Sequence, residues 1–255
     1  MIQTFIINMK KHTERKKYVE DALKKTIIQN YSFIEAVDGE IDLDKYNFKV
    51  MHNWYDNTKD RTITVGEIGC ALSHYKIWEK IVNEKIEKAL ILEDDVVFHE
   101  NFNEEYANIQ NISFHYDLFL LGRRREHYHS VFDTEDEIQI NDLLVIPKYS
   151  YNLQSYILTY EGALKLINAQ YLNHLIPVDE FLPIMYDINY PYVEYKKPFE
   201  KFKRIRTIAF KKCITNQMSK TIFPSSIDVS SIYCDKTPVF YYKSIPDYVI
   251  KKSIH

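Results

Sequence analysis

The feature that most constrains this chain is a run of four apolar residues, 89–92, followed at once by three carboxylates, Glu93, Asp94 and Asp95. A short, continuous apolar run is typical of a strand that is covered on both faces. In an open α/β sheet, ligands bind outside the carboxyl ends of the strands. We therefore expect the three carboxylates at the ligand-binding edge of a central sheet.

Other apolar runs predict the remaining strands, over residues 4–7, 31–37, 118–121 and 151–159. Helical spacing of apolar residues predicts helices from Thr13, from Thr64, over 161–169 and from Pro177. Thr64 and Glu67 have the spacing of a capping box, which fixes the start of the second helix. Strands that alternate with helices predict an α/β fold with a mostly parallel central sheet and helices on both faces.

Charge and glycine content narrow the possible ligands. The 33 basic and 36 acidic residues nearly cancel, so the chain has no general field for attracting nucleic acid, and we expect no such partner. The five glycines form neither a dinucleotide-binding nor a P-loop pattern. A phosphate-bearing ligand would therefore be held by a metal ion and basic side chains. Residues 42–61 are polar and irregular, and we expect them to form a surface excursion.

Nothing in the sequence predicts export or membrane insertion. The first apolar run is too short for a signal peptide, and no stretch approaches the ~20 apolar residues that span a bilayer. Three cysteines, Cys70, Cys213 and Cys234, are odd in number and share no C-x-x-C spacing, which predicts free thiols in a reducing compartment. We therefore expect a soluble intracellular protein with no signal peptide, transmembrane segment or retention signal.

The three carboxylates are a candidate metal site. Adjacent carboxylates repel one another, and their place against an apolar strand adds a desolvation cost. A divalent cation removes both penalties, and Mg²⁺ or Mn²⁺ commonly binds one or two carboxylates together with substrate phosphates. If strand alternation continues, Glu93 and Asp95 point to one side and Asp94 to the other. Glu93 and Asp95 are thus the predicted metal ligands, and a solvated acidic turn is the alternative.

Four groups of residues resemble, in the same order, the motifs of glycosyltransferase family 25, which includes bacterial lipooligosaccharide galactosyltransferases and the procollagen galactosyltransferases. The groups are residues 6–9 with 14–15 and 35–39, 64–74 with Trp78, 90–95, and 118–125 with 149–151, 161–166 and 177–185. The resemblance runs from the first strand to residue 195. Its last group is more similar to the procollagen galactosyltransferases than to the bacterial enzymes.

The resemblance implies a GT-A type nucleotide-sugar-binding fold and an inverting transfer of galactose from UDP-galactose that depends on Mn²⁺ or another divalent cation. It implies one domain over 1–255, with a nucleotide-sugar and metal half at 1–122, an acceptor half at 123–195, and a basic tail at 196–255 as a candidate lid. The implied acceptor is hydroxylysine of collagen or a collagen-like protein. The alternatives are a lipopolysaccharide-core galactosyltransferase and a non-catalytic relative that binds a sugar nucleotide or glycan. A homo-oligomer is left open.

Contacts with the donor are also implied by the resemblance, at Asn8, Arg15, Asp38, Gly66, Gly69, His74, Asp94 and Arg123. Several of these residues have a structural alternative. Arg15 could be an exposed first-turn arginine, and the two glycines could serve helix packing. His74 could be a satisfied structural histidine, and Arg123 could belong to a solvated basic loop.

A second pair of acids, Asp179 and Glu180, opens the helix predicted after Pro177. An inverting transfer needs a base within hydrogen-bond reach of the acceptor hydroxyl. We predict Asp179 as that base and Glu180 as an acceptor contact or the second candidate for the base. The alternative is structural, because acids at a helix start are favoured by the helix dipole.

The end of the chain departs from the family pattern. The family's catalytic domain usually ends with a Ser-Asp pair that helps to bind the metal or the diphosphate. Here residues 225–228 read Ser, Ser, Ile, Asp, so the aspartate is displaced. We predict Asp228 as the third metal ligand, with the absence of a third ligand as the alternative.

Overall fold

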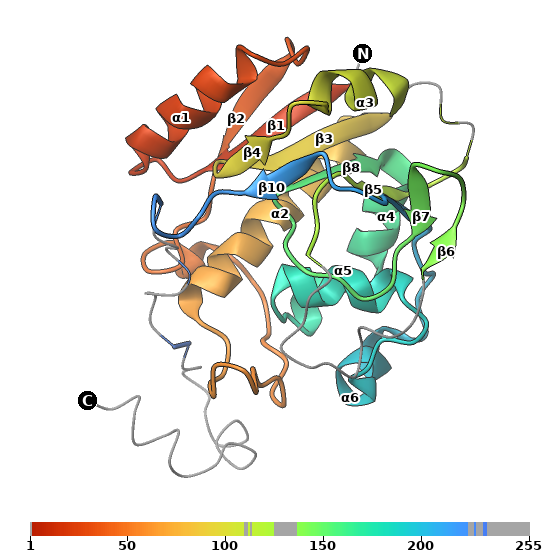
Figure 1. Cartoon of the computed structure of the whole chain (residues 1–255). Helices are drawn as coiled ribbons and strands as arrows, with labels where there is room; N and C mark the ends of the chain where they lie inside the picture. The colour runs from red at the N-terminus through yellow and green to blue at the C-terminus, as the bar shows by residue number, and fades with distance from the viewer. Residues whose placement is uncertain are drawn as a thin grey trace.

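The computed structural model describes residues 2–109, 112, 114–124, 137–223, 227 and 232–233. Its centre is an eight-stranded sheet in the order β2-β1-β3-β8-β5-β9-β7-β6 (Figure 1). The strands are β1 (Gln3–Asn8), β2 (Tyr31–Glu35), β3 (Lys88–Glu93), β5 (Leu118–Leu120), β6 (Ile138–Gln139), β7 (Leu144–Ile146), β8 (Ser155–Thr159) and β9 (Thr207–Phe210). A small second sheet pairs β4 (Val96–Phe98) with β10 (Thr215–Gln217).

The central sheet is mixed. β1 pairs in parallel with β2 and β3, and β5 pairs in parallel with β9. β8 runs antiparallel between β3 and β5, and β7 pairs antiparallel with β6 and β9. The predicted α/β class is confirmed, but the sheet is less parallel than expected. A continuous apolar run reports burial on both faces and carries no information on strand direction, so the sequence could not orient β8.

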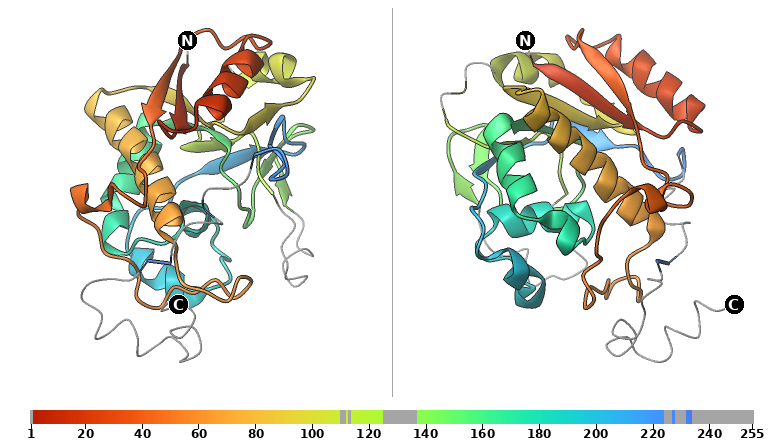
Figure 2. Two further views of the ribbon diagram at one scale, coloured as in Figure 1. Left: turned by 90° about the vertical axis from the view of Figure 1, so that its left-hand side faces the viewer. Right: turned by 180° about the vertical axis from the view of Figure 1, so that it is seen from behind.

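Helices cover both faces of the sheet, as predicted. α1 (Thr13–Leu23) and α3 (Phe102–Asn108) pack on one face, and α2 (Val65–Asn83), α4 (Tyr160–Asn168) and α5 (Val178–Tyr186) pack on the other. The left view of Figure 2 shows α1 and α2 on opposite sides of β1 and β2. Alternate strand residues supply the two cores: Ile6 and Leu92 join the core of α1 and α3, whereas Phe5 and Ile91 join Trp78 of α2.

Shorter elements connect this framework. They are η1 (Leu43–Lys45), η4 (Tyr171–Asn173), α6 (Val193–Lys196) and η5 (Lys197–Phe199). Among the described helices, none is both long enough and apolar enough to cross a membrane.

The start of α2 follows the predicted capping box. The Thr64 hydroxyl accepts a hydrogen bond from the Glu67 backbone N–H, and the Glu67 carboxylate accepts one from the Thr64 backbone N–H at 2.8 Å. α1 begins at Thr13 as predicted, although Thr13 is its first residue and His12 holds the capping position without a side-chain hydrogen bond. The capping box therefore fixes α2 more firmly than any side chain fixes the start of α1.

A close backbone approach holds α2 against the loop that follows β2. A Cβ atom placed on Gly69 would lie 2.6 Å from the Val37 carbonyl oxygen and 2.9 Å from the Gly39 nitrogen. The Ser73 hydroxyl adds to this contact, because it accepts a hydrogen bond from the Val37 N–H at 2.8 Å. Gly69 therefore has the packing role that was the alternative to ligand contact.

This packing predicts the sign of one substitution. Alanine usually stabilises a helix interior relative to glycine by about 1 kcal/mol. Gly69→Ala should instead lower the free energy of unfolding by about 1–3 kcal/mol, because the new methyl group must displace backbone atoms. Chemical denaturation of the wild type and the variant measures the difference. A variant as stable as the wild type, or more stable, would show that the loop after β2 moves away freely.

Candidate active site

The carboxyl ends of β1, β2 and β3 open into a cleft of about 800 Å³. The first turns of α1 and α2 close its sides, so backbone N–H groups of two helix starts lie near the strand ends (Figure 1). The predicted residues that line this cleft are Arg15, Asp38, Gly66, Glu93, Asp94 and Asp95. The cleft is therefore where the β3 carboxylates were expected to lie.

Arg15 holds two of the three carboxylates. Its Nη2 atom lies 2.8 Å from Asp94 Oδ1 and 2.6 Å from Asp95 Oδ2. Asn8, at the end of β1, donates a hydrogen bond to Asp94 Oδ2 at 2.7 Å. Asp94 is thus fixed through both oxygens, which suits a supporting role. The Arg15 side chain is only 13% exposed, so the alternative of an exposed arginine does not apply.

The carboxylate cluster carries more negative charge than its neighbours balance. Burial raises the pKa of Asp95 to about 7, with a further contribution from the charge of Glu93 and against the opposing charge of Arg15. Burial also raises the pKa of Asp94 to about 6, although Arg15 and Asn8 favour its ionised form. Within the described residues, the buried Asp95 Oδ1 has no hydrogen-bond partner. A divalent cation fits this cluster, because it would supply both the missing charge and the missing partner.

One oxygen of the Glu93 carboxylate contacts side chains of α2. This Oε1 atom lies 3.3 Å from His74 Nε2 and 3.9 Å from Cys70 Sγ. β3 ends at Glu93, and Asp94 and Asp95 form the turn before β4, so strand alternation no longer decides which carboxylates point together. The assignment of Glu93 and Asp95 as metal ligands therefore stays a prediction.

Four predicted donor contacts do not line the cleft: Asn8 and Gly69, whose contacts are described above, and His74 and Arg123. His74 is completely buried behind Glu93. Arg123 is 7% exposed, and its guanidinium donates to both oxygens of Glu137, at 2.5 and 2.7 Å. Arg123 is therefore part of a buried ion pair and not of a solvated loop. Asp228 lies outside the described residues.

The segment around β10 contributes cleft residues that the sequence did not reveal. Gln217 donates a hydrogen bond to Asp95 Oδ2 at 3.2 Å, and the Met218 N–H donates to the Asp95 carbonyl at 2.7 Å. The Phe223 ring lies 5.7 Å from the Arg15 guanidinium. No motif in a single sequence places this distant segment over the β3 turn, because the contact depends on the pairing of β10 with β4.

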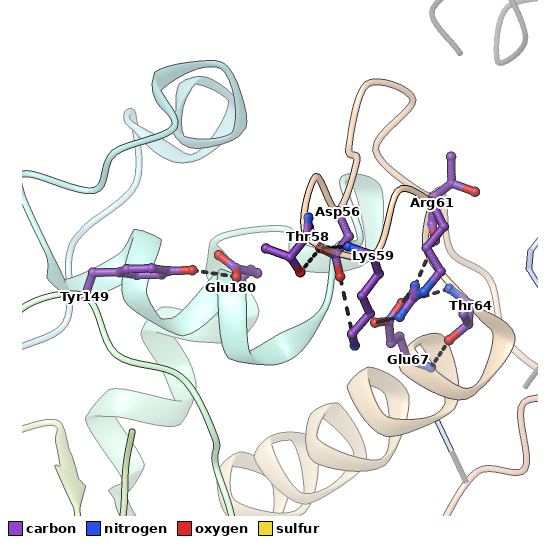
Figure 3. A network of polar contacts seen from close by, with 9 residues as sticks. Asp56, Thr58, Lys59, Arg61, Thr64, Glu67, Tyr149 and Glu180 are labelled. Atoms are coloured by element: carbon purple, nitrogen blue, oxygen red, sulfur yellow. Dashed lines mark hydrogen bonds and ion pairs between the residues drawn. The ribbon is translucent and has the colours of Figure 1, made fainter. Parts of the chain in front are cut away.

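A second, smaller pocket of about 160 Å³ contains the predicted catalytic pair, Asp179 and Glu180, at the start of α5. Glu180 is fixed by two tyrosines: Tyr149 Oη donates to one carboxylate oxygen at 2.6 Å, and Tyr190 Oη donates to the other at 2.7 Å (Figure 3 shows the Tyr149 contact). The other aromatic residues that line the pocket are Trp54, Tyr55, Tyr151, Tyr192 and Tyr195. Neither tyrosine partner was predicted, because tyrosines are frequent throughout the chain.

The loop over residues 56–61 forms one wall of this pocket. Arg61 donates to both oxygens of Glu67 at 2.8 Å, which ties the loop to the first turn of α2 (Figure 3). Asp56 and Arg61 are joined by backbone hydrogen bonds across the loop. The predicted surface excursion at 42–61 is therefore partly built into the pocket, and its polar composition gave no sign of this.

Asp179 connects the pocket electrostatically with the cleft. Burial raises its pKa to about 7, and the charges of Glu67 and Glu93 raise it further, whereas Lys59 opposes the shift. Burial and the charge of Asp179 raise the pKa of Glu180 to about 8. Cys70 lines the cleft, and its own pKa is raised by burial and by both Glu93 and Asp179. The first turns of α2 thus separate two acidic sites, and the charges of each site affect the pKa values of groups in or beside the other.

Comparison with known proteins gives consistent matches. A family model described as Glycosyltransferase family 25 (LPS biosynthesis protein) matches residues 1–182. Procollagen galactosyltransferase 2 of Homo sapiens is 34% identical over 206 residues, which cover 78% of this chain and 32% of that protein. Procollagen lysyl hydroxylase and glycosyltransferase of Acanthamoeba polyphaga mimivirus is 37% identical over 201 residues, which cover 73% of this chain and 22% of that protein.

The relatives are not all named as active enzymes. Inactive glycosyltransferase 25 family member 3 of Mus musculus is 34% identical over 209 residues, which cover 77% of this chain and 34% of that protein. The matched region therefore spans only 22–34% of the length of these relatives.

The raised pKa of Asp179 predicts how stability depends on pH. Between the ordinary value of 3.8 and about 7, the folded state keeps a proton that the unfolded chain has lost, so the wild type loses stability as pH rises through this window. Asp179→Asn cannot ionise, and its melting temperature should exceed that of the wild type by a few degrees at pH 8. The gap should narrow towards pH 5.

Thermal melts in metal-free buffer at both pH values measure this difference. Asp44→Asn, on the exposed surface, is the matched control and should show no such pH-dependent gap. A gap of the same size at both pH values would mean that Asp179 is ionised at no cost to folding.

Proposed function

Because this chain belongs to glycosyltransferase family 25, we propose that it transfers galactose from UDP-galactose to a hydroxyl group of an acceptor, with inversion and with the help of a divalent cation. The supporting observation is the arrangement of two acidic sites around the first turns of α2. The cleft of about 800 Å³ is large enough for a sugar nucleotide, and the pocket of about 160 Å³ is suited to an acceptor side chain.

In this proposal the donor lies in the cleft at the ends of β1, β2 and β3. Mn²⁺ would be held by Glu93 and Asp95, and it supplies positive charge that stabilises the diphosphate as UDP departs. Arg15 keeps Asp94 and Asp95 together, and Asn8 orients Asp94 from the neighbouring strand. Gly66, in the first turn of α2, lines the same cleft, and the positive end of the helix dipole there favours an anionic ligand.

Asp179 is the proposed base. It takes the proton from the acceptor hydroxyl while that oxygen forms a bond to the anomeric carbon of galactose, and the bond from that carbon to the UDP oxygen breaks with its electron pair leaving on UDP. A base is most effective when its pKa lies near the working pH, and the pKa of Asp179 is raised to about 7. Glu180 is less suited to this role, because hydrogen bonds from Tyr149 and Tyr190 already occupy both of its oxygens.

The pocket supports hydroxylysine as the acceptor. Its aromatic walls and the fixed carboxylate of Glu180 suit a side chain that carries a positive charge, since ammonium groups bind favourably to aromatic faces and to acids. A hydroxylysine side chain has this charge together with the hydroxyl group that is to be glycosylated. Two relatives carry procollagen in their names, which agrees with this acceptor.

Two other functions have support of their own. The family description refers to LPS biosynthesis, which would mean a saccharide acceptor. A relative named inactive at 34% identity supports binding of a sugar nucleotide or glycan without turnover. In that second case the displaced Asp228 would be the departure that removed activity.

UDP release across UDP-sugars, with Mn²⁺ and with a hydroxylysine-containing collagen peptide or a saccharide acceptor, tests the proposal. We expect release with UDP-galactose and the peptide, and a rate about 10²–10⁴-fold lower for Asp179→Asn, because a positioned base contributes about that factor. UDP binding should be retained in the variant. Asp44→Asn, on the exposed surface, is the control and should be as active as the wild type. Asp187→Asn is not suitable, because the Asp187 carboxylate accepts a hydrogen bond from the Tyr149 backbone N–H.

Release with a saccharide but not with the peptide would replace the collagen acceptor. A wild type that binds UDP and transfers to no acceptor would favour the binding function. Full activity in Asp179→Asn would remove Asp179 from the role of base.

A further inference from the structure

Three buried side chains, His74, Tyr156 and Trp78, form a chain of polar contacts that ends at Glu93. His74 Nε2 lies 3.3 Å from Glu93 Oε1, and His74 Nδ1 lies 2.8 Å from Tyr156 Oη. Trp78 Nε1 donates a hydrogen bond to the same Tyr156 oxygen at 3.1 Å. His74, Trp78 and Tyr156 are all completely buried, so water does not compete for these contacts.

The fold explains why these residues meet. Tyr156 of β8 lies opposite Ile91 of β3, and Glu93 follows Ile91 on the same face of the strand. That face is covered by α2, on which His74 and Trp78 are four residues apart and therefore neighbours on one side of the helix. The antiparallel pairing of β8 with β3 thus places a tyrosine hydroxyl between the two α2 side chains.

The hydrogen bonds favour one arrangement of protons. The indole N–H of Trp78 can only donate, so the Tyr156 oxygen must accept from it. The Tyr156 hydroxyl then has its own proton to give, and His74 Nδ1 is its remaining partner among the described residues. Since Nδ1 accepts, the ring hydrogen is on Nε2, and it points at Glu93 Oε1.

We propose that Trp78, Tyr156 and His74 are positioning residues that fix the tautomer of His74 and thereby orient the Glu93 carboxylate for the ion. This inference rests on the proposed function in one respect, which is that Glu93 binds the divalent cation. His74 donates to Oε1, and Oε2, which has no hydrogen-bond partner within the described residues, is the oxygen available to the cleft. Hydrogen bonds to a carboxylate ligand typically change metal affinity by about 10–100-fold.

The spacing of donor atoms also permits a different interpretation. Cys70 Sγ, a ring nitrogen of His74 and a Glu93 oxygen lie within 4.8 Å of one another, as ligands of a transition metal could. Such a site needs an unprotonated Nε2 on His74, which places the ring hydrogen on Nδ1. The Tyr156 oxygen would then receive hydrogens from both Trp78 and His74, and its own buried proton would lose its acceptor, which is unfavourable. The hydrogen-bond pattern therefore favours the positioning role.

The first test reads the tautomer directly and needs neither metal nor activity. Nitrogen NMR of the protein with ¹⁵N-labelled histidine distinguishes the protonated from the unprotonated ring nitrogen, and His74→Gln identifies the His74 signals. We expect the hydrogen on Nε2 in the wild type and a mixture of tautomers in Tyr156→Phe. A hydrogen on Nδ1 in the wild type would overturn the proposal.

The second test measures Mn²⁺ binding by the electron paramagnetic resonance signal of the free ion, without donor or acceptor. Tyr156→Phe should weaken binding by about tenfold. Tyr171→Phe is the matched control, because it keeps the ring that packs against Trp78 and removes another fully buried tyrosine hydroxyl from the same core. This hydroxyl donates to the Ile176 carbonyl and, within the described residues, makes no hydrogen bond to Glu93, His74 or Trp78. Its Mn²⁺ affinity should equal that of the wild type.

Substitutions at His74 separate positioning from packing. His74→Gln can keep a donor towards Glu93 and should retain more Mn²⁺ affinity than His74→Leu, which cannot. Equal losses in Tyr156→Phe and Tyr171→Phe, or equal affinities of the Gln and Leu variants, would overturn the proposal. If the wild type binds no Mn²⁺ at all, the metal role of Glu93 fails with the proposed function, and the tautomer alone then decides whether the three residues orient this carboxylate.

Discussion

Negative charge gathered at the end of one buried strand is the constraint on which the site depends. Glu93 ends β3 and Asp94 and Asp95 follow it in the turn, where burial disfavours the ionised forms of the two aspartates. Arg15 neutralises part of this charge, and hydrogen bonds from Asn8 and Gln217 hold the two aspartates. The negative charge that Arg15 does not offset favours a cation at this site. A metal ion bound together with a diphosphate would reduce the repulsion between the carboxylates.

Helix α2 connects the cleft with the second pocket, which contains Asp179 and Glu180. Its capping-box residue Glu67 holds the loop at 56–61 through Arg61, and Gly69 lets the helix approach the loop after β2. One turn further on, His74 reaches Glu93 from the buried side of the helix. A single helix therefore sets the distance between the cleft and the pocket, and loops supply the walls around it. Rigid elements position reacting groups more accurately than loops do.

Local sequence signals predicted the parts of the fold that local physics decides. The apolar run before Glu93 predicted a buried strand, Thr64 with Glu67 predicted the start of α2, and both are confirmed. The strand ends also brought Arg15 and Asp94 to one cleft, as expected. Family resemblance, more than spacing, identified Asp179 and Glu180, and both lie in a pocket.

Contacts between distant segments could not be predicted in this way. The direction of β8 is set by pairing, which an apolar run does not encode, yet it places Tyr156 beside His74. The tyrosines that fix Glu180 and the glutamine that reaches Asp95 lie 31, 10 and 122 residues away from their partners in sequence. Arg123 was expected near the donor but forms an ion pair with Glu137. The sequence around Arg123 does not show that the chain brings Glu137, 14 residues away, against it.

On the proposed function, the charge at the β3 turn binds a sugar nucleotide through a divalent cation. Calorimetric titration of UDP into the protein, once with Mn²⁺ and once with EDTA, measures this binding. We expect binding with Mn²⁺, its loss in EDTA, and its loss in Asp95→Asn even when Mn²⁺ is present. Equal affinity for UDP with Mn²⁺ and with EDTA would contradict it.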